Sequence, residues 1–162
     1  MDIPLAFEPL TSSHTDLAAA LWSDPVVIRY TAVASPLSRK ESEDRMAALL
    51  DMQRKLSFPT IFAVMYKGEH CGIIGCLPVD HEKGVYSLFY QFRSQAWGKG
   101  IGGSSARWLL AYMRQRMNRL VLIADAAAVN TASIKILESL EFQKEGEGEK
   151  GVLHYILTLN RK

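Results

Sequence analysis

The sequence has few cysteines and no grouping of metal-ligand residues. Among its 162 residues are only two cysteines, Cys71 and Cys76, which lie five positions apart in an apolar stretch. An odd spacing along a strand places two side chains on opposite faces, so no disulfide is expected between them. There is no Cys-x-x-Cys pair, and the four histidines are scattered. The sequence therefore predicts no metal site.

Long hydrophobic runs and a strong excess of one charge are also missing. The formal net charge is +2, which is too small to favour nucleic acid as a partner. No stretch approaches the about 18 apolar residues of a membrane span, and the N-terminus lacks a basic segment followed by an apolar one. The sequence therefore predicts a cytoplasmic protein that does not enter a membrane.

The composition itself is typical of a folded domain. Hydrophobic residues make up 48% and charged residues 22%, and no internal repeat, low-complexity tract or linker interrupts the chain. We therefore expect a single domain over residues 1–162.

Apolar periodicity and turn residues predict a mixed α/β (α+β) fold. A first strand over residues 3–10 is followed by two helices, one ending at Pro25 and one beginning with the capping-box pair Ser38 and Glu41. Further strands are expected over residues 61–66, 71–79, 85–92, 120–124 and 152–159, and helices over residues 101–117 and 130–140, with one more strand left open after Phe142. The expected sheet is mostly antiparallel, with six to seven strands, one parallel step and about four flanking helices.

A glycine-rich segment lies between the strand over residues 85–92 and the helix that follows. It reads Gln95-Ala96-Trp97-Gly98-Lys99-Gly100-Ile101-Gly102-Gly103. Glycine permits positive φ and a close approach of a ligand to the backbone, and the first amides of a helix are unpaired. The helix dipole adds positive potential at the same end. The segment therefore predicts a site for an anion such as a diphosphate.

Two other interpretations of the segment are weaker. Gly98-x-Gly100-x-x-Gly103 matches the fingerprint of nicotinamide-binding folds, but it follows at least four predicted strands instead of the first one. A P-loop needs a Lys-Ser/Thr pair after its last glycine, and this pair is absent. A nicotinamide-dependent oxidoreductase and a glycine-rich turn without a ligand remain as alternatives.

Two blocks of the sequence resemble the GNAT superfamily of N-acetyltransferases. Gln95-x-x-Gly98-x-Gly100, followed by Ile-Gly, is similar to the family's Gln/Arg-x-x-Gly-x-Gly/Ala signature, and Asn130-x-x-Ser133 is similar to its later helix block. The order of elements resembles the family over nearly the whole chain. The two helices after the first strand look most like the RimJ/RimL branch, which acetylates protein N-termini.

The resemblance implies an enzyme that moves an acetyl group from acetyl-CoA to a primary amine, either a protein N-terminus or a small amine. An acyl-CoA-binding sensor without turnover is the alternative. The sheet would splay between residues 85–92 and 120–124 to admit acyl-CoA, and the loops over residues 28–39 and 80–84 would select the acceptor. Relatives are often dimers, which leaves a homodimer open.

The resemblance also implies contacts to the cofactor. They are expected at Phe92, Gln95, Trp97, Gly98, Lys99, Gly100, Ile101, Gly102, Gly103, Asn130 and Ser133. The backbone near Phe92 would pair with the pantetheine arm, the amides of residues 95–103 would hold the diphosphate, and Ser133 would lie near the sulfur. Asn130 and Ser133 also suit helix capping.

The chain departs from the family where proton-transfer residues are usual. Ser87 stands where many relatives have a glutamate base, and Leu137 where many have a tyrosine acid. The catalytic candidates are Ser133, Tyr90 and Ser87. Ser133 could donate to the leaving thiolate, whereas His81 is expected to be a solvated turn residue.

Overall fold

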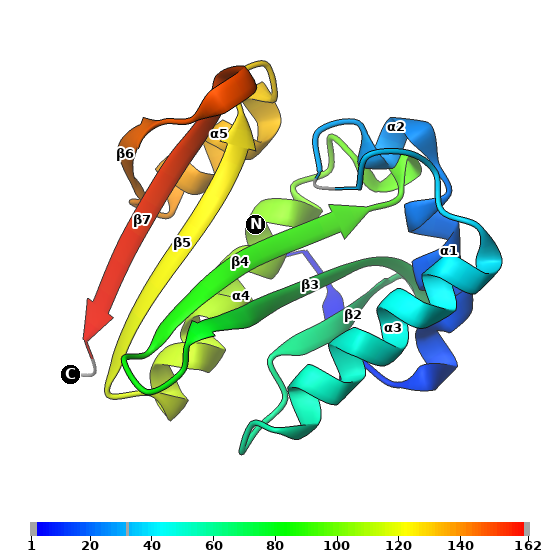
Figure 1. Ribbon diagram of the computed structural model, residues 1–162, viewed down its shortest axis with the longest axis horizontal. Helices are drawn as coiled ribbons and strands as arrows, with labels where there is room; N and C mark the ends of the chain where they lie inside the picture. The colour runs from blue at the N-terminus through cyan, green and yellow to red at the C-terminus, as the bar shows by residue number, and fades with distance from the viewer. Residues whose placement is uncertain (1–2, 32, 161–162) are drawn as a thin grey trace. The chain divides into compact units, whose positions relative to one another are not determined.

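Seven strands form one sheet in the computed structural model, which describes residues 3–31 and 33–160 (Figure 1). They are β1 (Leu5–Pro9), β2 (Ile61–Tyr66), β3 (Glu69–Asp80), β4 (Val85–Phe92), β5 (Arg119–Ala127), β6 (Gln143–Glu147) and β7 (Val152–Asn160). Their order is β1-β2-β3-β4-β5-β7-β6. β4 and β5 pair in parallel, whereas β1–β2, β2–β3, β5–β7 and β6–β7 pair antiparallel. This arrangement confirms the predicted fold class, and β6 supplies the further strand after Phe142.

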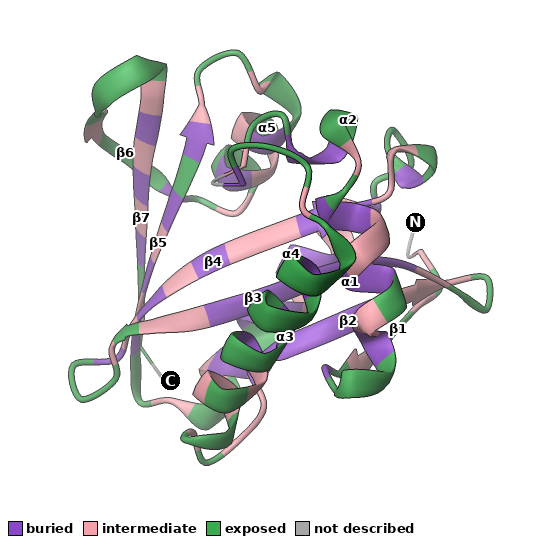
Figure 2. Cartoon of the chain, turned by 45° about the vertical axis from the view of Figure 1, so that its right-hand side comes forward, coloured by how far each residue is buried: buried purple, intermediate pink, exposed green. Residues whose placement is uncertain are grey.

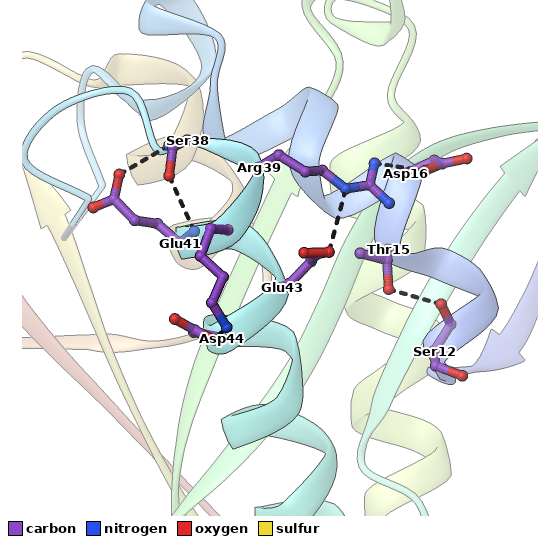
Figure 3. A network of polar contacts seen from close by, with 9 residues as sticks. Ser12, Thr15, Asp16, Ser38, Arg39, Glu41, Glu43 and Asp44 are labelled. Carbon is purple, nitrogen blue, oxygen red and sulfur yellow. Dashed lines mark hydrogen bonds and ion pairs between the residues drawn. The ribbon is translucent and has the colours of Figure 1, made fainter.

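Five α-helices lie in the described part of the chain. They are α1 (Thr15–Trp22), α2 (Pro25–Ile28), α3 (Arg39–Arg54), α4 (Ile101–Arg116) and α5 (Thr131–Ser139), with three short 3-10 segments, η1 (Ser12–His14), η2 (Ser94–Ala96) and η3 (Glu149–Gly151). The predicted capping box opens α3: the side chains of Ser38 and Glu41 each accept a hydrogen bond from the other residue's backbone N–H (Figure 3). None of these helices, within residues 3–31 and 33–160, combines the length and apolar character needed to cross a membrane.

Pro25 begins a helix, although the sequence predicts that it ends one. α1 stops at Trp22, and Asp24 then caps α2, because its Oδ1 accepts a hydrogen bond from the Val26 amide at 2.9 Å. Proline suits the first turn of a helix, since its φ is already helical and its missing N–H would have no partner there. The capping aspartate before the proline therefore starts the additional helix α2.

The chain divides into two compact units. The first unit comprises Met1–Gly75 and Tyr90–Gly102, and the second comprises Cys76–Phe89 and Gly103–Lys162. β3 and β4 each contribute residues to both units. The single domain over residues 1–162 stays a prediction, and each unit is described below by itself.

Buried strands and two linked helices characterise the first unit. Residues 61–64 of β2 are at most 3% exposed, so both faces of that strand are covered (Figure 2). The Trp22 indole ties α1 to β4, because its Nε1–H donates to Oε1 of Gln91 at 2.6 Å inside the core. On the surface, Arg39 Nη1 of α3 lies 2.7 Å from Asp16 Oδ1 of α1 (Figure 3). The buried bond fixes the end of β4 that leads into the glycine-rich segment.

The second unit is built on the long pair of β5 and β7. Their register aligns Arg119 with Asn160 and continues without a break to Ala127 and Val152. Even-numbered residues 120–126 of β5 are buried, so its odd-numbered residues form the more exposed face. The parallel ladder to β4 is short, since it joins only residues 85–87 to residues 121–123. An early end of this ladder is what the predicted splay of the two strands requires.

Candidate functional site

The glycine-rich segment has the backbone conformation that an anion site needs. Gly98 and Gly100 have φ values of +77° and +80°, and α4 begins directly after them at Ile101. Gly102 and Gly103 therefore lie in the first turn of the helix rather than in the loop before it. That turn contains no acidic residue, so nothing on it opposes the positive end of the helix dipole.

The surroundings of the two loop glycines leave room for a ligand. A Cβ placed on Gly98 would meet no other atom within 4 Å. A Cβ on Gly100 would meet Ile3 Cδ1 at 3.0 Å. An open backbone followed by unpaired helix amides fits a diphosphate, because its oxygens can accept N–H donors from the loop and the helix together.

Trp97 fastens the segment to the end of β4. Its indole Nε1–H donates to the Phe92 carbonyl oxygen at 3.0 Å, while its ring remains 48% exposed. The Arg93 amide donates to the Cys71 carbonyl at 2.8 Å. The bond from Trp97 uses one of the two lone pairs on the Phe92 carbonyl oxygen. The Arg93 amide is engaged within the chain as well, and pairing of the pantetheine arm with the backbone near Phe92 stays a prediction.

Two cationic side chains, Lys99 and Arg107, come from the glycine-rich segment and from the helix α4 that follows it. In the first unit, Lys99 Nζ lies 5.8 Å from the centroid of the Tyr66 ring. In the second unit, Arg107 Nη2 donates to Ser104 Oγ at 3.4 Å, and its guanidinium lies 3.7 Å from where a Cβ on Gly103 would be. A cation beside a helix N-terminus opposes the dipole unless an anion is also bound. Sequence reasoning missed Arg107, although its place one turn after Gly103 could have revealed it.

Asn130 and Ser133 lie at the start of α5 in the second unit. Asn130 Oδ1 accepts a hydrogen bond from the Ser133 amide at 3.2 Å, which caps the helix. Ser133 is buried. The capping expected of Asn130 is confirmed, whereas Ser133 takes part in the cap only through its backbone amide. Contact of either residue with a cofactor stays a prediction.

The catalytic candidates are distributed over both units. Ser87 of β4 lies opposite Ile123 of β5 in the second unit, which also holds Ser133. Tyr90 belongs to the first unit, where its ring lies 6.3 Å from that of Phe92. Leu137, where relatives carry a tyrosine, is a core residue of α5. Their roles in proton transfer stay predictions.

His81 lies in an exposed turn, as expected, but it is more than a solvated residue. Its Nδ1 lies 2.5 Å from the hydroxyl of Tyr86, whose ring is fully buried. Burial raises the pKa of Tyr86, and the neighbouring Cys76 raises it further. The raised pKa keeps the phenol protonated at neutral pH, and its oxygen and His81 Nδ1 share one hydrogen bond whose donor depends on the tautomer of His81. His81 thus serves to satisfy a buried hydroxyl.

Another polar pair of the second unit joins two strands. Asp125 Oδ1 on β5 lies 2.6 Å from His154 Nδ1 on β7, and the two residues are direct cross-strand partners. Sequence reasoning missed this pair. The residues lie 29 positions apart, and only the register of β5 against β7 brings them together.

A cluster of Glu8, His14 and His70 in the first unit has ligand atoms within 4.8 Å of one another. The Thr11 amide donates to His14 Nδ1 at 3.0 Å. His14 therefore carries its proton on Nε2, which lies 3.7 Å from Glu8 Oε1 and offers no lone pair to a metal. His70 Nε2 lies 2.6 Å from the same oxygen, and this hydrogen bond is the main reason that the pKa of Glu8 is lowered. The cluster is accordingly a hydrogen-bond network around one carboxylate.

The predicted acceptor loop over residues 28–39 is described except for Ala32, which lies outside the described residues. Next to α2, the Tyr30 ring is exposed, and the Arg29 guanidinium lies 5.0 Å from its centroid. Exposed aromatic and basic groups of this kind suit contact with a polar acceptor.

Comparison with known proteins gives one family. The family described as "Acetyltransferase (GNAT) domain" matches residues 5–143. The chain is 28% identical over 144 residues to "Uncharacterized N-acetyltransferase p20" of Bacillus licheniformis, which covers 88% of this chain and 80% of that protein.

Solved structures share the fold. RimL, a ribosomal L7/L12 alpha-N-protein acetyltransferase in complex with coenzyme A, superposes with a TM-score of 0.83 at 15% identity, covering 98% of this chain and 96% of that chain. Aminoglycoside acetyltransferase AAC(6')-Ib, also in complex with coenzyme A, gives a TM-score of 0.73 at 13% identity, covering 96% and 95%.

Proposed function

Because the chain belongs to the GNAT family of acetyltransferases, we propose that it transfers the acetyl group of acetyl-CoA to the α-amine of a protein N-terminus. The chain is an acetyltransferase, and acetyl-CoA is its co-substrate. Among primary amines in general, we choose the α-amine of a protein N-terminus as the acceptor.

The glycine-rich segment carries the proposal. Positive φ at Gly98 and Gly100, followed at once by the unpaired amides of α4, provides N–H donors for a diphosphate. In this proposal the contacts to acetyl-CoA come from Phe92, Gln95, Trp97, Gly98, Lys99, Gly100, Ile101, Gly102, Gly103, Asn130 and Ser133. Arg107 is added to them, because its cation lies beside the first turn of α4.

The reaction needs an uncharged amine and a donor for the thioester oxygen. A free α-amine has a pKa of about 7.7–8.0, so it is much easier to deprotonate than a lysine at about 10.4. A backbone amide near Phe92 is our candidate for the oxyanion donor. Ser133 is our candidate for the donor to the leaving thiolate, and Ser87 and Tyr90 would line the acceptor side.

A protein N-terminus is favoured over a polycationic small molecule by the summed charge of the two predicted acceptor loops. Residues 28–39 contain Arg29 and Arg39 but no carboxylate, and residues 80–84 contain Asp80 and Glu82 together with Lys83, so the two loops carry no net negative charge. An aminoglycoside carries several positive charges and would need a net acidic surface, which these loops do not supply. This chain has three helices, α1 to α3, between β1 and β2. Together with the likeness to RimL, they support the RimJ/RimL branch at the level of the fold. A cytoplasmic location and a homodimer stay predictions.

The test is calorimetric titration with acetyl-CoA, followed in the same samples by thiol release. The acceptors are lysine-free peptides with different first residues, the same peptides with acetylated N-termini as matched controls, and spermidine and an aminoglycoside as small amines. Thiol release with free but not with blocked peptides is the expected result. Turnover confined to a small amine would overturn the choice of acceptor, binding without any turnover would favour the sensor, and no binding would overturn the cofactor site.

A further inference from the structure

Two lysines lie beside the ring of Tyr66, the last residue of β2. Lys67 Nζ is 5.3 Å and Lys99 Nζ is 5.8 Å from the ring centroid. Lys67 belongs to the turn between β2 and β3, whereas Lys99 belongs to the glycine-rich segment, and we call the two the lysine pair. An ammonium group within about 6 Å of an aromatic centroid is attracted by the ring. Tyr66 therefore draws two like charges to one place, although they repel each other.

A second contact makes the β2–β3 turn and the glycine-rich segment neighbours within the first unit. Tyr66 pairs with Leu5 of β1. Two residues before Leu5, Ile3 Cδ1 lies 3.0 Å from where a Cβ on Gly100 would be. The lysine pair therefore borders the predicted diphosphate site.

The charge of the lysine pair is not neutralised within the part of the chain that the structure describes. The ion pairs that lysines form in residues 3–31 and 33–160 involve four other lysines, Lys40, Lys55, Lys83 and Lys144. Glu69, the cross-strand partner of Tyr66, is exposed and forms no ion pair within those residues. The turn and the glycine-rich segment therefore carry excess positive charge, which an anion could neutralise.

A further cation belongs to the same edge of the first unit. Burial raises the pKa of the Cys71 thiol, and the positive charges of Arg93 and Lys99 act against that rise. Arg93 Nε donates to the His70 carbonyl oxygen at 3.1 Å, which holds its side chain against β3. Arg93 thus adds to the positive potential beside the lysine pair.

Coenzyme A has phosphate groups of two kinds. Its diphosphate links the pantetheine arm to the adenosine, and a phosphate monoester is attached to the ribose. The monoester carries a charge of about −1.5 to −2 at pH 7 and has three strong acceptor oxygens. Lysine binds phosphate as a point charge, so two flexible ammonium groups suit a dianion. The backbone amides of the glycine-rich segment suit the diphosphate, which leaves the monoester for the lysine pair.

We propose that the lysine pair binds the phosphate monoester on the ribose of acetyl-CoA, and that Tyr66 is the residue that positions the two ammonium groups. This inference rests on the proposed function, and it concerns binding alone, with no covalent step. Its consequence is selectivity, because the enzyme then distinguishes acetyl-CoA from acetyl-dephospho-CoA, which lacks only this phosphate.

Calorimetry of the full chain with acetyl-CoA and with acetyl-dephospho-CoA tests the proposal. The wild type is expected to bind acetyl-CoA about 30-fold more tightly, because the contacts that the dephospho form lacks are charge-assisted. The double variant Lys67→Gln/Lys99→Gln should lower this ratio below about threefold, mainly by weakening the binding of acetyl-CoA. Each single variant should give an intermediate ratio, and high salt should lower the ratio of the wild type.

Control variants separate this role from a general effect of charge or of folding. Lys55→Gln removes the same charge from an exposed site of the first unit and should leave the ratio unchanged. Arg107→Ala should weaken both forms to the same extent, because its guanidinium lies beside the first turn of α4. Tyr66→Phe keeps the ring and should keep the ratio, whereas Tyr66→Leu should lower it to about half or less.

Equal affinity of the wild type for the two forms would overturn this inference, and so would an unchanged ratio in the double variant. In both cases, turnover of acetyl-CoA with a peptide would leave the proposed function standing. A ratio that collapses in Arg107→Ala but not in the double variant would assign the monoester to α4 and overturn the role of the lysine pair. If neither form binds, the proposed function fails and the inference falls with it.

Discussion

The glycine-rich segment and the β5–β7 pair differ in what builds them. The first is a backbone site: its proposed ligand contacts are amides, and its essential property is the positive φ of Gly98 and Gly100. The second, which we call the side-chain site, is the hydrogen bond between Asp125 Oδ1 and His154 Nδ1. Its length of 2.6 Å depends on the register of β5 against β7. A backbone site therefore fails when the chain is crowded or strained, whereas a side-chain site fails when a single functional group is exchanged.

Gly100→Glu should give the largest effect, because it adds a side chain with negative charge where a diphosphate is expected. A Cβ there would also press on Ile3 Cδ1 at 3.0 Å, and a φ of +80° is unfavourable for any residue with a Cβ. We expect acetyl-CoA affinity to fall more than about 100-fold by calorimetry, which corresponds to more than about 2.7 kcal/mol.

Gly68 provides the matched control for this change. It has a φ of +78° in the β2–β3 turn, and a Cβ placed on it would meet no other atom within 4 Å. Gly68→Glu should cost stability but leave affinity for acetyl-dephospho-CoA unchanged, because the β2–β3 turn is expected to contact only the ribose phosphate. Gly100→Gln should bind better than Gly100→Glu because it lacks the charge. Wild-type affinity in Gly100→Glu would place the diphosphate elsewhere.

Arg107→Ala tests whether the backbone site also needs a side chain. The loss of one guanidinium beside the first turn of α4 should weaken acetyl-CoA binding about tenfold, and less at high salt. Arg116→Ala removes the same charge from the last turn of α4 and is the control. Equal affinities for both variants and the wild type would show that the amides alone suffice.

The backbone site could be predicted from the sequence, because its parts are consecutive. Residues 95–103 carry the glycines, and the strand before them and the helix after them follow from local patterns. The start of α5 could be predicted for the same reason, since Asn130 caps a helix three residues before Ser133. Local signals of this kind need no knowledge of how the strands pair.

The side-chain site could not be predicted in this way. Neither Asp125 in an alanine-rich strand nor His154 in the closing strand has a distinctive neighbourhood, and their contact requires β7 to insert between β5 and β6. Pro25 shows the same limit on a smaller scale, because proline both ends and begins helices and the Asp24 cap decides which. Strand order and capping contacts are thus what sequence patterns leave open.

Ser133→Ala asks whether α5 contributes chemistry as well as structure. The cap to Asn130 uses the backbone amide of residue 133, so alanine should leave the helix intact. We expect kcat to fall about fivefold, or about 1 kcal/mol in the barrier, if the hydroxyl donates to the thiolate. Ser139→Ala, on the same helix, is the control. Unchanged kcat in Ser133→Ala would remove the Ser133 hydroxyl from the proton-transfer step and leave residue 133 with its backbone contact to Asn130 alone.

Glu141→Gly should have the smallest effect and the opposite sign. Glu141 ends α5 with a φ of +70°, a left-handed conformation in which the Phe142 amide donates to the Leu137 carbonyl at 3.0 Å. Glycine adopts this conformation without steric cost, so we expect a gain of about 0.5–1 kcal/mol in the free energy of unfolding, measured with urea. Lys135→Gly, inside the same helix, should instead lose about 1 kcal/mol. Both variants should retain wild-type turnover, because neither exchanges a residue proposed to contact acetyl-CoA or the acceptor; a loss of turnover in Glu141→Gly would show that the end of α5 contributes to the reaction.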